Sequence, residues 1–590
     1  MKIKTLALLP FVALGLTSCS TTSTNTTTTT TTDSTSQSIN LIKTIESKVY
    51  RAPTALGDVD PNSPVLNVSF FDISKDVPYI KVNEFLNTYF NGFLCGGQTV
   101  ISCEDGVLTN NLTNVTMKFD VKNNTISTKD LDLFTSIMAT DVIHRDVLSA
   151  LTDSSASLVE DKCSRKAGKE MVWNLDDYYM NLVSYDKEVY VPFSVLETIF
   201  LAPLGLTIAF NGNDFYYSNT AVMYTTDGKV NEFGKAYYSG SLANLASRSE
   251  SYSKYFYGSF LFTMENYNGK YPTMGYTSLD DALEDKGFKT KLLSSDSLLA
   301  DKALADVINS MFCDGGHTAF YNCGVNVSLD ASRDKIMSKE LLKYDTRAVS
   351  SRRVEEILQD ERGVKTYKLT ENLKISGQTA VISFDQFSLN AQNRVPTKET
   401  VADDKVSTFA ILYNSFNTIK NINNNNIKNV VIDVSLNGGG QAPALGEALG
   451  FLTNDDIVFT VENPVTGAIN TETVKYDTDL DGDFNDDDSY EGMFNFYILT
   501  SDCSFSCGNA LPCIAKDYGY AKIIGATSGG GDCTVGYACA IDGASWQMSA
   551  TASIIHKDGT NVDSGAEVDY KISVSHFYDV EWLNSYLNTL

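Results

Sequence analysis

From about residue 365 onward the chain alternates short apolar strands with helices, and this alternation constrains the fold more than any other feature. TAVISFDQF (379–387) and KNVVIDVS (428–435) are apolar and β-branched, which is typical of buried strands. SFNTIK (415–420) and APALGEALGFL (442–452) have helical spacing. Strands that alternate with helices predict an α/β layout for residues 366–590.

The chain has 590 residues, too many for one hydrophobic core, so two or three domains are expected. Residues 40–230 mix strand-like and helix-like segments. We interpret them as an N-terminal α+β module that serves as a binding module or as a spacer. VPYIKVNEFLNTYF (77–90) and EVYVPFSVLETIF (188–200) look like two copies of one strand–helix unit, and 206–219 like a hairpin with an Asn-Gly turn. Residues 231–365 have mainly helical patterns.

The N-terminus, MKIKTLALLPFVALGLTSCS, has a basic start, a short apolar core and small residues before Cys19. It is too short to span a membrane as a mature helix. LTSC resembles a bacterial lipobox, so we expect residues 1–19 to be a lipoprotein signal peptide with Cys19 lipidated. A secretory signal cut elsewhere is the alternative. Residues 20–39 are rich in Thr and Ser and predict a flexible linker. We therefore expect an extracytoplasmic protein, lipid-anchored to a bacterial membrane or cell surface.

The charge and the cysteines also bear on function. A net charge of −27 argues against nucleic-acid binding through a basic surface.

Besides Cys19 there are ten cysteines, which in an oxidising compartment favour disulfides. Three close pairs are predicted to form local loops: Cys95–Cys103, Cys313–Cys323 and Cys533–Cys539. Zinc is the weaker alternative, because no CxxC pair and only four histidines are present.

The segment VVIDVSLNGGG (430–440) predicts a buried strand that enters a glycine-rich turn before a helix. Glycines there let the backbone N–H groups of Gly438 and Gly439 approach an anion or an oxyanion, and the helix N-terminus favours negative charge. The segment matches neither a dinucleotide fingerprint nor a P-loop. A simple tight turn is the alternative.

Residues 494–533, FNFYILTSDCSFSCGNALPCIAKDYGYAKIIGATSGGGDC, predict a strand, a turn, a helix, a second strand and another glycine-rich turn. A serine at the start of that helix lies on a sharp bend, where its hydroxyl is exposed and the helix dipole favours developing negative charge. Ser504 and Ser506 both have this position.

In this order, the two stretches resemble the tail-specific (C-terminal-processing) serine peptidase family, whose clan includes the tricorn core and the chlamydial protease-like activity factor. The resemblance covers roughly residues 370–580, with a looser match back to 250. It implies a ClpP/crotonase-like catalytic core. Its spacing to the KDYG segment (516–519) makes Ser506 the nucleophile.

One branch of this family uses a lysine base, and here that position is Gly531. The other branch uses a histidine in a D-G-H-T motif, which CDGGHTAFYNC (313–323) resembles, with His317 in place. An imidazole whose pKa is near neutrality suits the removal of the serine proton. The resemblance therefore implies that His317 is the general base.

The third member of the triad is implied near the chain end, in DGTNVDSGAEVDYKI (558–572). Asp563 is the nearest match, as an aspartate where the family has glutamate, and Glu567 is the alternative. Two further positions depart from the family pattern: Asn509 replaces a glutamate and Gly316 replaces a serine.

The resemblance implies a serine endopeptidase that cleaves proteins or peptides through an acyl-enzyme. The oxyanion would be held by the N–H of Cys507 and that of Gly438 or Gly439. A cysteine nucleophile is disfavoured, because an oxidising compartment would oxidise it. The alternative is a catalytically impaired peptidase fold that acts as a surface binding protein or adhesin. The oligomeric state does not follow from the sequence.

YDTDLDGDFNDDD (476–488) matches an EF-hand-type loop within residues 366–590, the expected catalytic peptidase domain or peptidase region. The glycine at its sixth position permits a sharp turn, and clustered carboxylates repel one another unless a cation joins them. We expect a structural calcium site in 477–488, against the alternative of a solvated acidic loop. The expected ligands are Asp477, Asp479, Asp481, Asp483 and Asp488.

Overall fold

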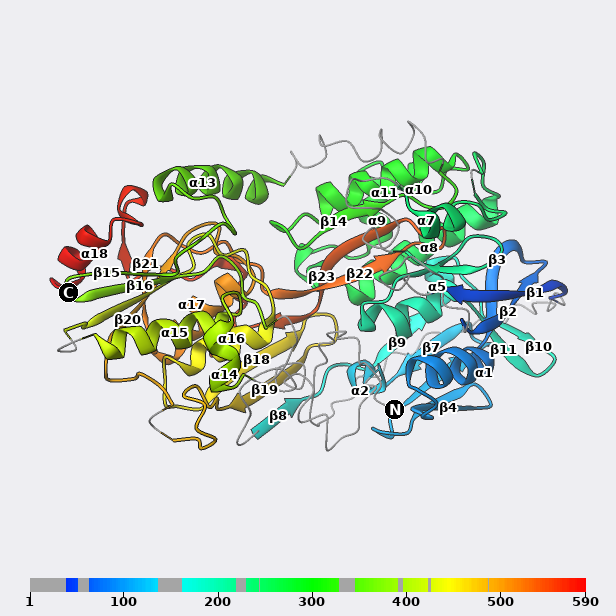
Figure 1. Cartoon of the computed structure of the whole chain (residues 1–590). Coiled ribbons are helices and arrows are strands. Elements are labelled where there is room, and N and C mark those ends of the chain that lie inside the picture. The colour runs from blue at the N-terminus through cyan, green and yellow to red at the C-terminus, as the bar shows by residue number, and fades with distance from the viewer. Residues whose placement is uncertain are drawn as a thin grey trace, which may run out of the picture.

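The computed structural model describes residues 39–50, 63–135, 162–218, 230–243, 245–327, 345–390, 396–422, 426–485 and 488–590. Cys19 and the signal peptide lie outside the described residues. The described chain is a mixed α/β protein with two six-stranded sheets, one seven-stranded sheet and one five-stranded sheet (Figure 1). This confirms the predicted fold class, an α/β fold with an additional N-terminal α+β module.

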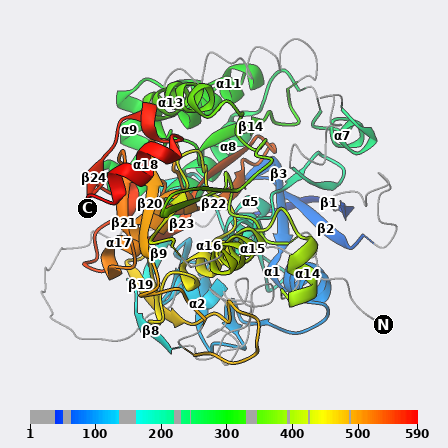
Figure 2. The same ribbon diagram turned by 60° about the vertical axis from the view of Figure 1, so that its left-hand side comes forward.

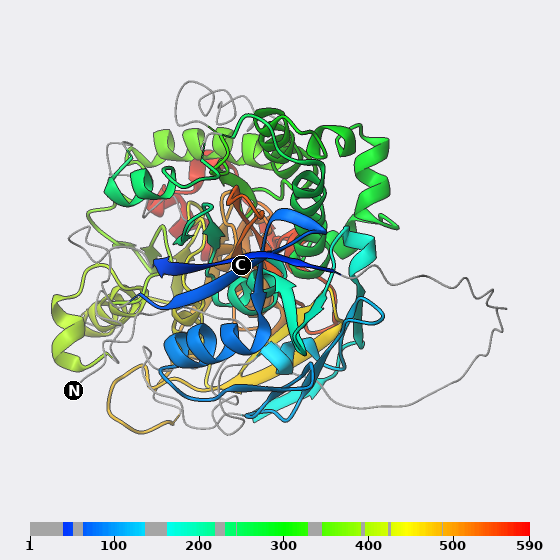
Figure 3. The ribbon, with the colours of Figure 1, turned by 90° about the vertical axis from the view of Figure 1, so that its right-hand side faces the viewer.

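The N-terminal part contains the predicted doubled unit. β3 (Ser74–Lys81) continues into α1 (Val82–Glu84) and η1 (Phe85–Leu94), and β11 (Glu188–Pro192) into α5 (Phe193–Leu196) and η3 (Glu197–Leu201). The two strands pair antiparallel, so the copies lie side by side in one sheet. β12 (Ile208–Phe210) and β13 (Phe215–Tyr217) form the predicted hairpin. Figure 3 views the molecule from this end.

The seven-stranded sheet has the order β10-β11-β3-β2-β1-β13-β12, and the five-stranded sheet has the order β4-β5-β6-β7-β9. Their remaining strands are β1 (Leu41–Tyr50), β2 (Val65–Phe71), β4 (Ile101–Glu104), β5 (Val107–Asn110), β6 (Thr116–Asp120), β7 (Thr125–Thr128), β9 (Met171–Asn174) and β10 (Val183–Tyr185). Two short helices of this part, α2 (Leu131–Thr135) and η4 (Ala202–Leu204), lie near the candidate site described below.

The helical region follows. Its helices are α7 (Glu232–Tyr237), α8 (Glu250–Tyr267), α9 (Leu279–Asp285), α10 (Lys289–Leu292), α11 (Ser297–Met311) and α13 (Thr346–Arg362). Ser249 and Asp296 start α8 and α11 by accepting hydrogen bonds from Tyr252 N and Leu299 N. Within the described part of the chain, no helix has both the length and the apolar character that crossing a membrane would require.

The peptidase region is built on a sheet with the order β15-β16-β17-β20-β21-β24. β16 (Thr379–Ser383), β17 (Asn429–Asp433), β20 (Asn495–Thr500), β21 (Lys522–Gly525) and β24 (Tyr570–Lys571) pair in parallel, and β15 (Leu373–Ser376) pairs antiparallel at one end. Val430 and Val431 are fully buried, as expected of strands covered on both faces.

Helices of the peptidase region join these strands, and one more closes the chain: α14 (Lys398–Asp403), α15 (Thr408–Asn421), α16 (Ala442–Gly450), α17 (Cys507–Tyr518) and α18 (Val580–Leu587). Their order confirms the predicted alternation of strands and helices. Figure 2 shows α17 beside β20 and β21, with α18 at the C-terminal edge.

The last sheet connects the two halves of the molecule. It contains β14 (Ala319–Asn322), β23 (Ser545–Ile554), β18 (Ile457–Asn463), β19 (Ala468–Val474) and β8 (Lys162–Lys166), with β22 (Cys533–Cys539) beside β23. In Figure 1 the hairpin β22–β23 extends from the peptidase sheet into the N-terminal half. Trp546 and Met548 of β23 belong to the same apolar core as the N-terminal sheets and α8. The hairpin therefore holds the halves together.

The predicted disulfides are wrong. No disulfide joins the nine cysteines whose side chains the structure describes. Cys533 and Cys539 stand at opposite ends of the same strand, which holds them too far apart to bond. Cys503, unassigned from the sequence, donates a hydrogen bond from its thiol to the Ser351 carbonyl (3.2 Å).

Candidate active site

Ser506 immediately precedes α17, at the bend where β20 leads into that helix. Its backbone has φ 57° and ψ −123°, a left-handed conformation that a serine adopts only under constraint. Such strain costs about 1–3 kcal/mol and is concentrated at functional sites. Hydrogen bonds hold it: Ser506 N donates to the Gly530 carbonyl (2.9 Å), and Ala510 N donates to the Ser506 carbonyl (2.8 Å). The bend leaves the Ser506 side chain partly exposed.

Two glycines allow close backbone approaches around this bend. A Cβ on Gly439 would lie 2.6 Å from the Ser506 Cβ, so any larger residue would displace the nucleophile. A Cβ on Gly530 would lie 2.2 Å from the Asp563 carbonyl oxygen. Both glycine-rich turns that stood out in the sequence therefore contact the bend directly, one on each side.

Ser504, the other serine considered, has a structural role. Its hydroxyl donates to the Val434 carbonyl (2.8 Å) and accepts from Ser501 N (3.0 Å), and its side chain is fully buried. Of the two serines, only Ser506 has an exposed hydroxyl.

His317 lies in a turn that packs on the residue preceding the nucleophile. The imidazole meets the Phe505 ring edge-on, with 4.7 Å between centroids, and the Gly315–Gly316 backbone lies against the same ring. The Asp314 carboxylate builds the turn by accepting from Thr318 N (2.8 Å) and from the Ser549 hydroxyl (2.6 Å). The turn thus joins α11, the β22–β23 hairpin and the nucleophile bend.

His317 is 5% exposed, and its Nδ1 has no hydrogen-bond partner among the residues that the structure describes. Burial lowers the pKa of the imidazole, the nearby ammonium of Lys270 adds to this, and the carboxylates of Asp314, Asp532 and Asp563 oppose it. The net effect lowers the pKa below 6.5, so the ring is neutral at pH 7. A neutral imidazole is the form that can accept a proton.

Asp563 lies across the glycine-rich turn 529–531 from Ser506. Its carboxylate accepts from Gly531 N (2.9 Å) and forms ion pairs with Lys270 Nζ (2.9 Å) and with Arg347 (3.1 Å to Nη1). Burial alone would raise the pKa of this carboxyl, but the two cations and the N–H lower it to about 2. Asp563 is therefore ionised at neutral pH.

Glu567, the alternative acid, is exposed, and its backbone carbonyl accepts a hydrogen bond from Lys516. An exposed carboxylate is poorly placed to act on the buried imidazole. The geometry thus favours Asp563 over Glu567. Asn509 supports the same loop: its Nδ2 donates to the Val562 carbonyl (3.0 Å), which ties α17 to the segment that carries Asp563.

The three predicted triad residues gather around one turn, but their side chains are not hydrogen-bonded to each other. Among the described residues, no hydrogen bond joins Ser506 Oγ to His317 or His317 to Asp563, and Asp563 is instead engaged by Lys270 and Arg347. The roles of the three residues therefore stay predictions.

Sequence reasoning missed three charged residues at this site. Lys270 follows α8 and bridges Asp532 and Asp563, while Arg347 at the start of α13 holds Asp563 and also donates to the Gly529 carbonyl (2.7 Å). Asp532 is 3% exposed and also accepts from Ser553 and Asn561. The one sequence feature that could have indicated Asp532 is its position directly after the three glycines 529–531.

The predicted oxyanion donors separate into two groups. Gly439 N donates to the Asn437 side chain (2.9 Å), so this N–H is already engaged. The N–H groups of Cys507 and Gly438 donate to no acceptor within the described chain, and Cys507 begins α17, where the helix dipole favours an anion. The geometry therefore favours Cys507 with Gly438 over Cys507 with Gly439.

The Cys507 thiol is not available as a nucleophile. Its Sγ donates to the Gly440 carbonyl (3.4 Å), and burial raises its pKa to about 12. A thiol held protonated reacts poorly, because the thiolate is the nucleophilic form. The residue can act through its backbone.

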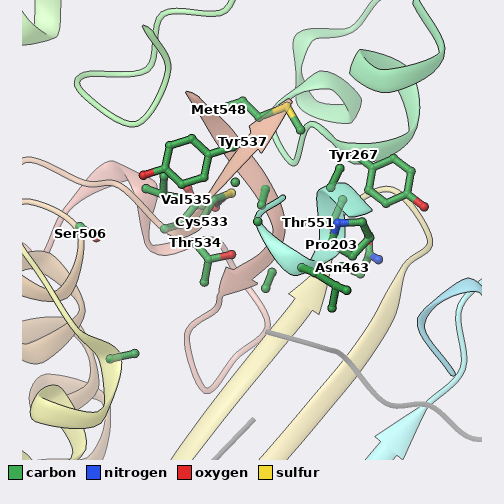
Figure 4. A pocket seen from close by; sticks show the side chains of 18 of the residues that line it. Pro203, Tyr267, Asn463, Ser506, Cys533, Thr534, Val535, Tyr537, Met548 and Thr551 are labelled. Carbon is green, nitrogen blue, oxygen red and sulfur yellow. Dashed lines mark hydrogen bonds between the residues drawn. The ribbon is translucent and has the colours of Figure 1, made fainter. Parts of the chain in front are cut away.

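A cavity of about 420 Å³ opens beside Ser506. Figure 4 shows Ser506 on one side of the cavity, Cys533, Val535 and Tyr537 of β22 in the middle, and Pro203 and Tyr267 on the far side. Its lining includes Ser506, Cys507, Gly440 and Gly531 from the peptidase region and α2, η4 and Tyr267 from the N-terminal and helical parts. A cavity of this size accommodates several residues of a peptide.

The predicted calcium loop has the local geometry of a carboxylate cluster. Asp477, Asp479 and Asp481 each offer one oxygen, and these oxygens lie within 4.8 Å of one another. The Asp477 carboxylate accepts from Asp481 N (3.2 Å) and Gly482 N (3.0 Å), which wraps the loop around it. Asp488 accepts from Asn485 N and Thr478 N, and Asp483 N donates to Asp481. All-oxygen donors of this kind fit Ca²⁺.

Residues 405–572 match the family model of peptidase family S41. The match includes Ser506, Cys507, Asp563, both glycine-rich turns and the acidic loop, whereas His317 lies outside it. The class of protein that this match indicates for residues 405–572 is a serine-type peptidase, as predicted. The match also confirms the predicted resemblance to the tail-specific peptidase family, which in this chain is carried by the S41 region.

Among solved structures, the photosystem II D1 C-terminal processing protease is similar at 17% identity with a TM-score of 0.25, over 33% of this chain and 42% of that one. A putative peptidase from Parabacteroides merdae is similar at 16% identity and TM-score 0.39, over 57% and 96%. Mature CPAF in complex with lactacystin is similar at 9% identity and TM-score 0.36, over 56% and 95%. The match thus spans less than half of the D1 processing protease. A comparison with curated protein sequences found no match.

Proposed function

We propose that this protein is an extracytoplasmic serine endopeptidase, with Ser506 as nucleophile and His317 as general base. The observation that carries the proposal is the constrained backbone of Ser506 at the start of α17 within the S41 match. The positive φ turns the hydroxyl out of the bend at a helix N-terminus, where negative charge is favoured. The substrate class is a protein or peptide.

In the first step Ser506 Oγ attacks the carbonyl carbon of the scissile bond while His317 takes the hydroxyl proton. The tetrahedral oxyanion is held by the N–H groups of Cys507 and Gly438, and one such donor lowers the barrier by roughly 3–4 kcal/mol. Protonated His317 then gives its proton to the leaving amine, and the acyl-enzyme forms. Water, activated by the same imidazole, releases the acid product and restores Ser506.

Closure around substrate has to bring His317 and Ser506 into hydrogen-bond contact. Catalytic hydrogen bonds are often long in a free enzyme and tighten in the complex. Asp563 stabilises the imidazolium through its charge, held in place by Lys270 and Arg347. A positioning role of this kind fits its ion pairs better than a direct hydrogen bond.

The location and the metal belong to the same proposal. The LTSC segment supports lipidation at Cys19 and attachment to a bacterial membrane or cell surface. The loop 477–488 fits a structural Ca²⁺ ion held by Asp477, Asp479 and Asp481, with Asp488 and the backbone at Asp483 as further donors. The ion would stiffen the insertion between β19 and β20.

A fluorophosphonate probe tests the nucleophile. Folded wild-type protein should be labelled, with the adduct on Ser506 by mass spectrometry, and Ser506→Ala should abolish labelling. Ser504→Ala is the matched control and should retain it. If folded wild-type protein does not react with the probe, the proposed hydrolase function is contradicted. That result would favour the alternative, a peptidase fold that acts as a surface binding protein or adhesin.

A further inference from the structure

The cavity beside Ser506 has two walls that come from distant parts of the sequence. One wall is the nucleophile bend with β22, and the other is formed by Leu131, Leu204 and Tyr267. The N-terminal module therefore faces the candidate active site across the cavity (Figure 4). A module that served only as a spacer would have no reason to line it.

β22 presents an open edge to this cavity. It pairs with β23 and with no other described strand, and the five residues 533–537 all line the cavity. Ala540 N donates to the Ala544 carbonyl (2.8 Å) at the end of the hairpin, which makes 540–544 a hydrogen-bonded pair. In an antiparallel ladder, hydrogen-bonded pairs alternate with non-hydrogen-bonded pairs. With the observed register, the backbone groups of Ala538 and Gly536 therefore also form hydrogen bonds with β23. The backbone groups of Val535 and Tyr537 therefore point outward.

The charged residues that line the cavity indicate which part of a polypeptide it can bind. Among the described lining residues there is no lysine or arginine, and there are two aspartates, Asp132 and Asp532. A free α-carboxylate would find no lysine or arginine among these described lining residues, and of the two aspartates Asp532 is already paired with Lys270. The side chains along the walls are mainly apolar, including Leu204, Val535 and Tyr267. This environment suits the interior of a chain with apolar side chains.

We propose that the outer edge of β22 binds an extended internal segment of a polypeptide as an added strand, with the N-terminal module as the opposite wall that receives apolar side chains. This inference rests on the proposed peptidase function and names its substrate class. Strand addition supplies affinity through main-chain hydrogen bonds and specificity through pockets for alternate side chains. The strand begins two residues after Gly531, next to the nucleophile bend, so a segment on this edge leads to Ser506.

The first test compares quenched fluorescent peptides of one apolar sequence that end in a free acid or in an amide. Equal kcat/KM for the two peptides is expected, because no lysine or arginine is among the described residues that line the cavity. A preference of about tenfold or more for the free acid would overturn the inference and indicate recognition of chain ends.

The second test uses Val535→Pro, with Val535→Leu as the matched control. Proline removes the outward N–H without removing a bond to β23, so KM for the peptide should rise about tenfold, whereas leucine should leave it within about twofold. Fluorophosphonate labelling of Ser506 should be unchanged in both variants. Equal KM values in two labelled variants would overturn the inference, whereas absent labelling of the wild type would instead overturn the peptidase proposal.

A third variant, Leu204→Glu, covers the case in which the proline variant does not fold. Leu204 is partly buried on the opposite wall, in the N-terminal module. A carboxylate there should raise KM for an apolar peptide about tenfold and lower it for a peptide with lysine at alternate positions. Unchanged KM for both peptides in a labelled protein would show that the N-terminal module does not contact the substrate.

Discussion

The His317 imidazole packs edge-on against the ring of Phe505, with 4.7 Å between the ring centroids. Because Phe505 directly precedes Ser506, one aromatic ring fixes the candidate base relative to the candidate nucleophile. The Gly315–Gly316 backbone lies on the same ring, so the whole histidine turn is positioned by it. The two halves of the site, about 190 residues apart in sequence, thus meet at this side chain.

Replacing this ring should damage catalysis more than folding. Phe505→Ala is expected to lower kcat by about 100-fold, because a shift of about 1 Å in a catalytic group has an effect of that size. Phe505→Leu keeps an apolar contact and should lose less. Peptide cleavage and thermal melting measured side by side separate the effects. An unchanged kcat in a folded Phe505→Ala protein would contradict the role given to this contact.

Activity should depend on pH through His317. Burial lowers the pKa of the imidazole, and only the neutral ring accepts the serine proton. kcat/KM should therefore rise with pH and reach its plateau with a midpoint below 6.5. His317→Asn should lower kcat/KM by at least about 10³-fold and should abolish its rise with pH. A midpoint at or above 6.5 would mean that another group controls the rate.

Asp563 should affect both stability and catalysis. Ion pairs lower the pKa of Asp563 to about 2 from 3.8, so the folded state binds this proton more weakly than the unfolded state does. The resulting stabilisation, about 2 kcal/mol, is present above pH 3.8 and is lost as the pH falls toward 2. At pH 7, Asp563→Asn should lose this stabilisation, measured as a lower urea midpoint of unfolding, and it should also have a lower kcat.

Glu567→Gln is the matched control for that variant, since Glu567 is exposed and was the alternative acid. It should leave the urea midpoint and kcat unchanged. If Glu567→Gln lowered kcat while Asp563→Asn did not, the two assignments would be exchanged.

Local patterns predicted the elements well, because strands and helices are set by short-range periodicity. The parallel strand β17, the bend before α17 and the doubled unit at β3 and β11 all follow from residues close together in sequence, whereas the choice of Ser506 over Ser504 came from the family resemblance. Glycine runs mark places where a backbone comes close to another group, as Gly439 does to Ser506.

Contacts between distant segments could not be predicted in the same way. Lys270 reaches Asp532 and Asp563 across more than 260 residues, and nothing in the turn around it signals that partner. The disulfide prediction failed for the opposite reason: closeness in sequence was taken as closeness in space, but an extended strand separates Cys533 from Cys539. The N-terminal wall of the cavity depends on the β22–β23 hairpin reaching into the other half, which no local pattern records.

The acidic loop 477–488 should make stability depend on calcium. The oxygens of Asp477, Asp479 and Asp481 lie within 4.8 Å of one another, and three negative charges at this separation repel unless a cation joins them. A chelator should therefore lower the melting temperature of the wild type by roughly 3–8 °C. Asp477→Asn combined with Asp481→Asn should erase the difference between chelated and calcium-loaded protein, because both the repulsion and the ligands are removed.

A double variant with the same change in charge controls for the loss of two carboxylates. Asp403 and Asp455 are exposed and lie outside the loop, so Asp403→Asn with Asp455→Asn should keep the full response to the chelator. Calorimetric titration with Ca²⁺ supplies a readout independent of melting, with binding expected in this control and absent in the loop variant. Equal melting temperatures of the wild type with and without chelator, together with no heat of binding, would reduce the loop to a solvated acidic segment. Labelling of Ser506 by the fluorophosphonate should persist without calcium, because the loop lies outside the nucleophile bend.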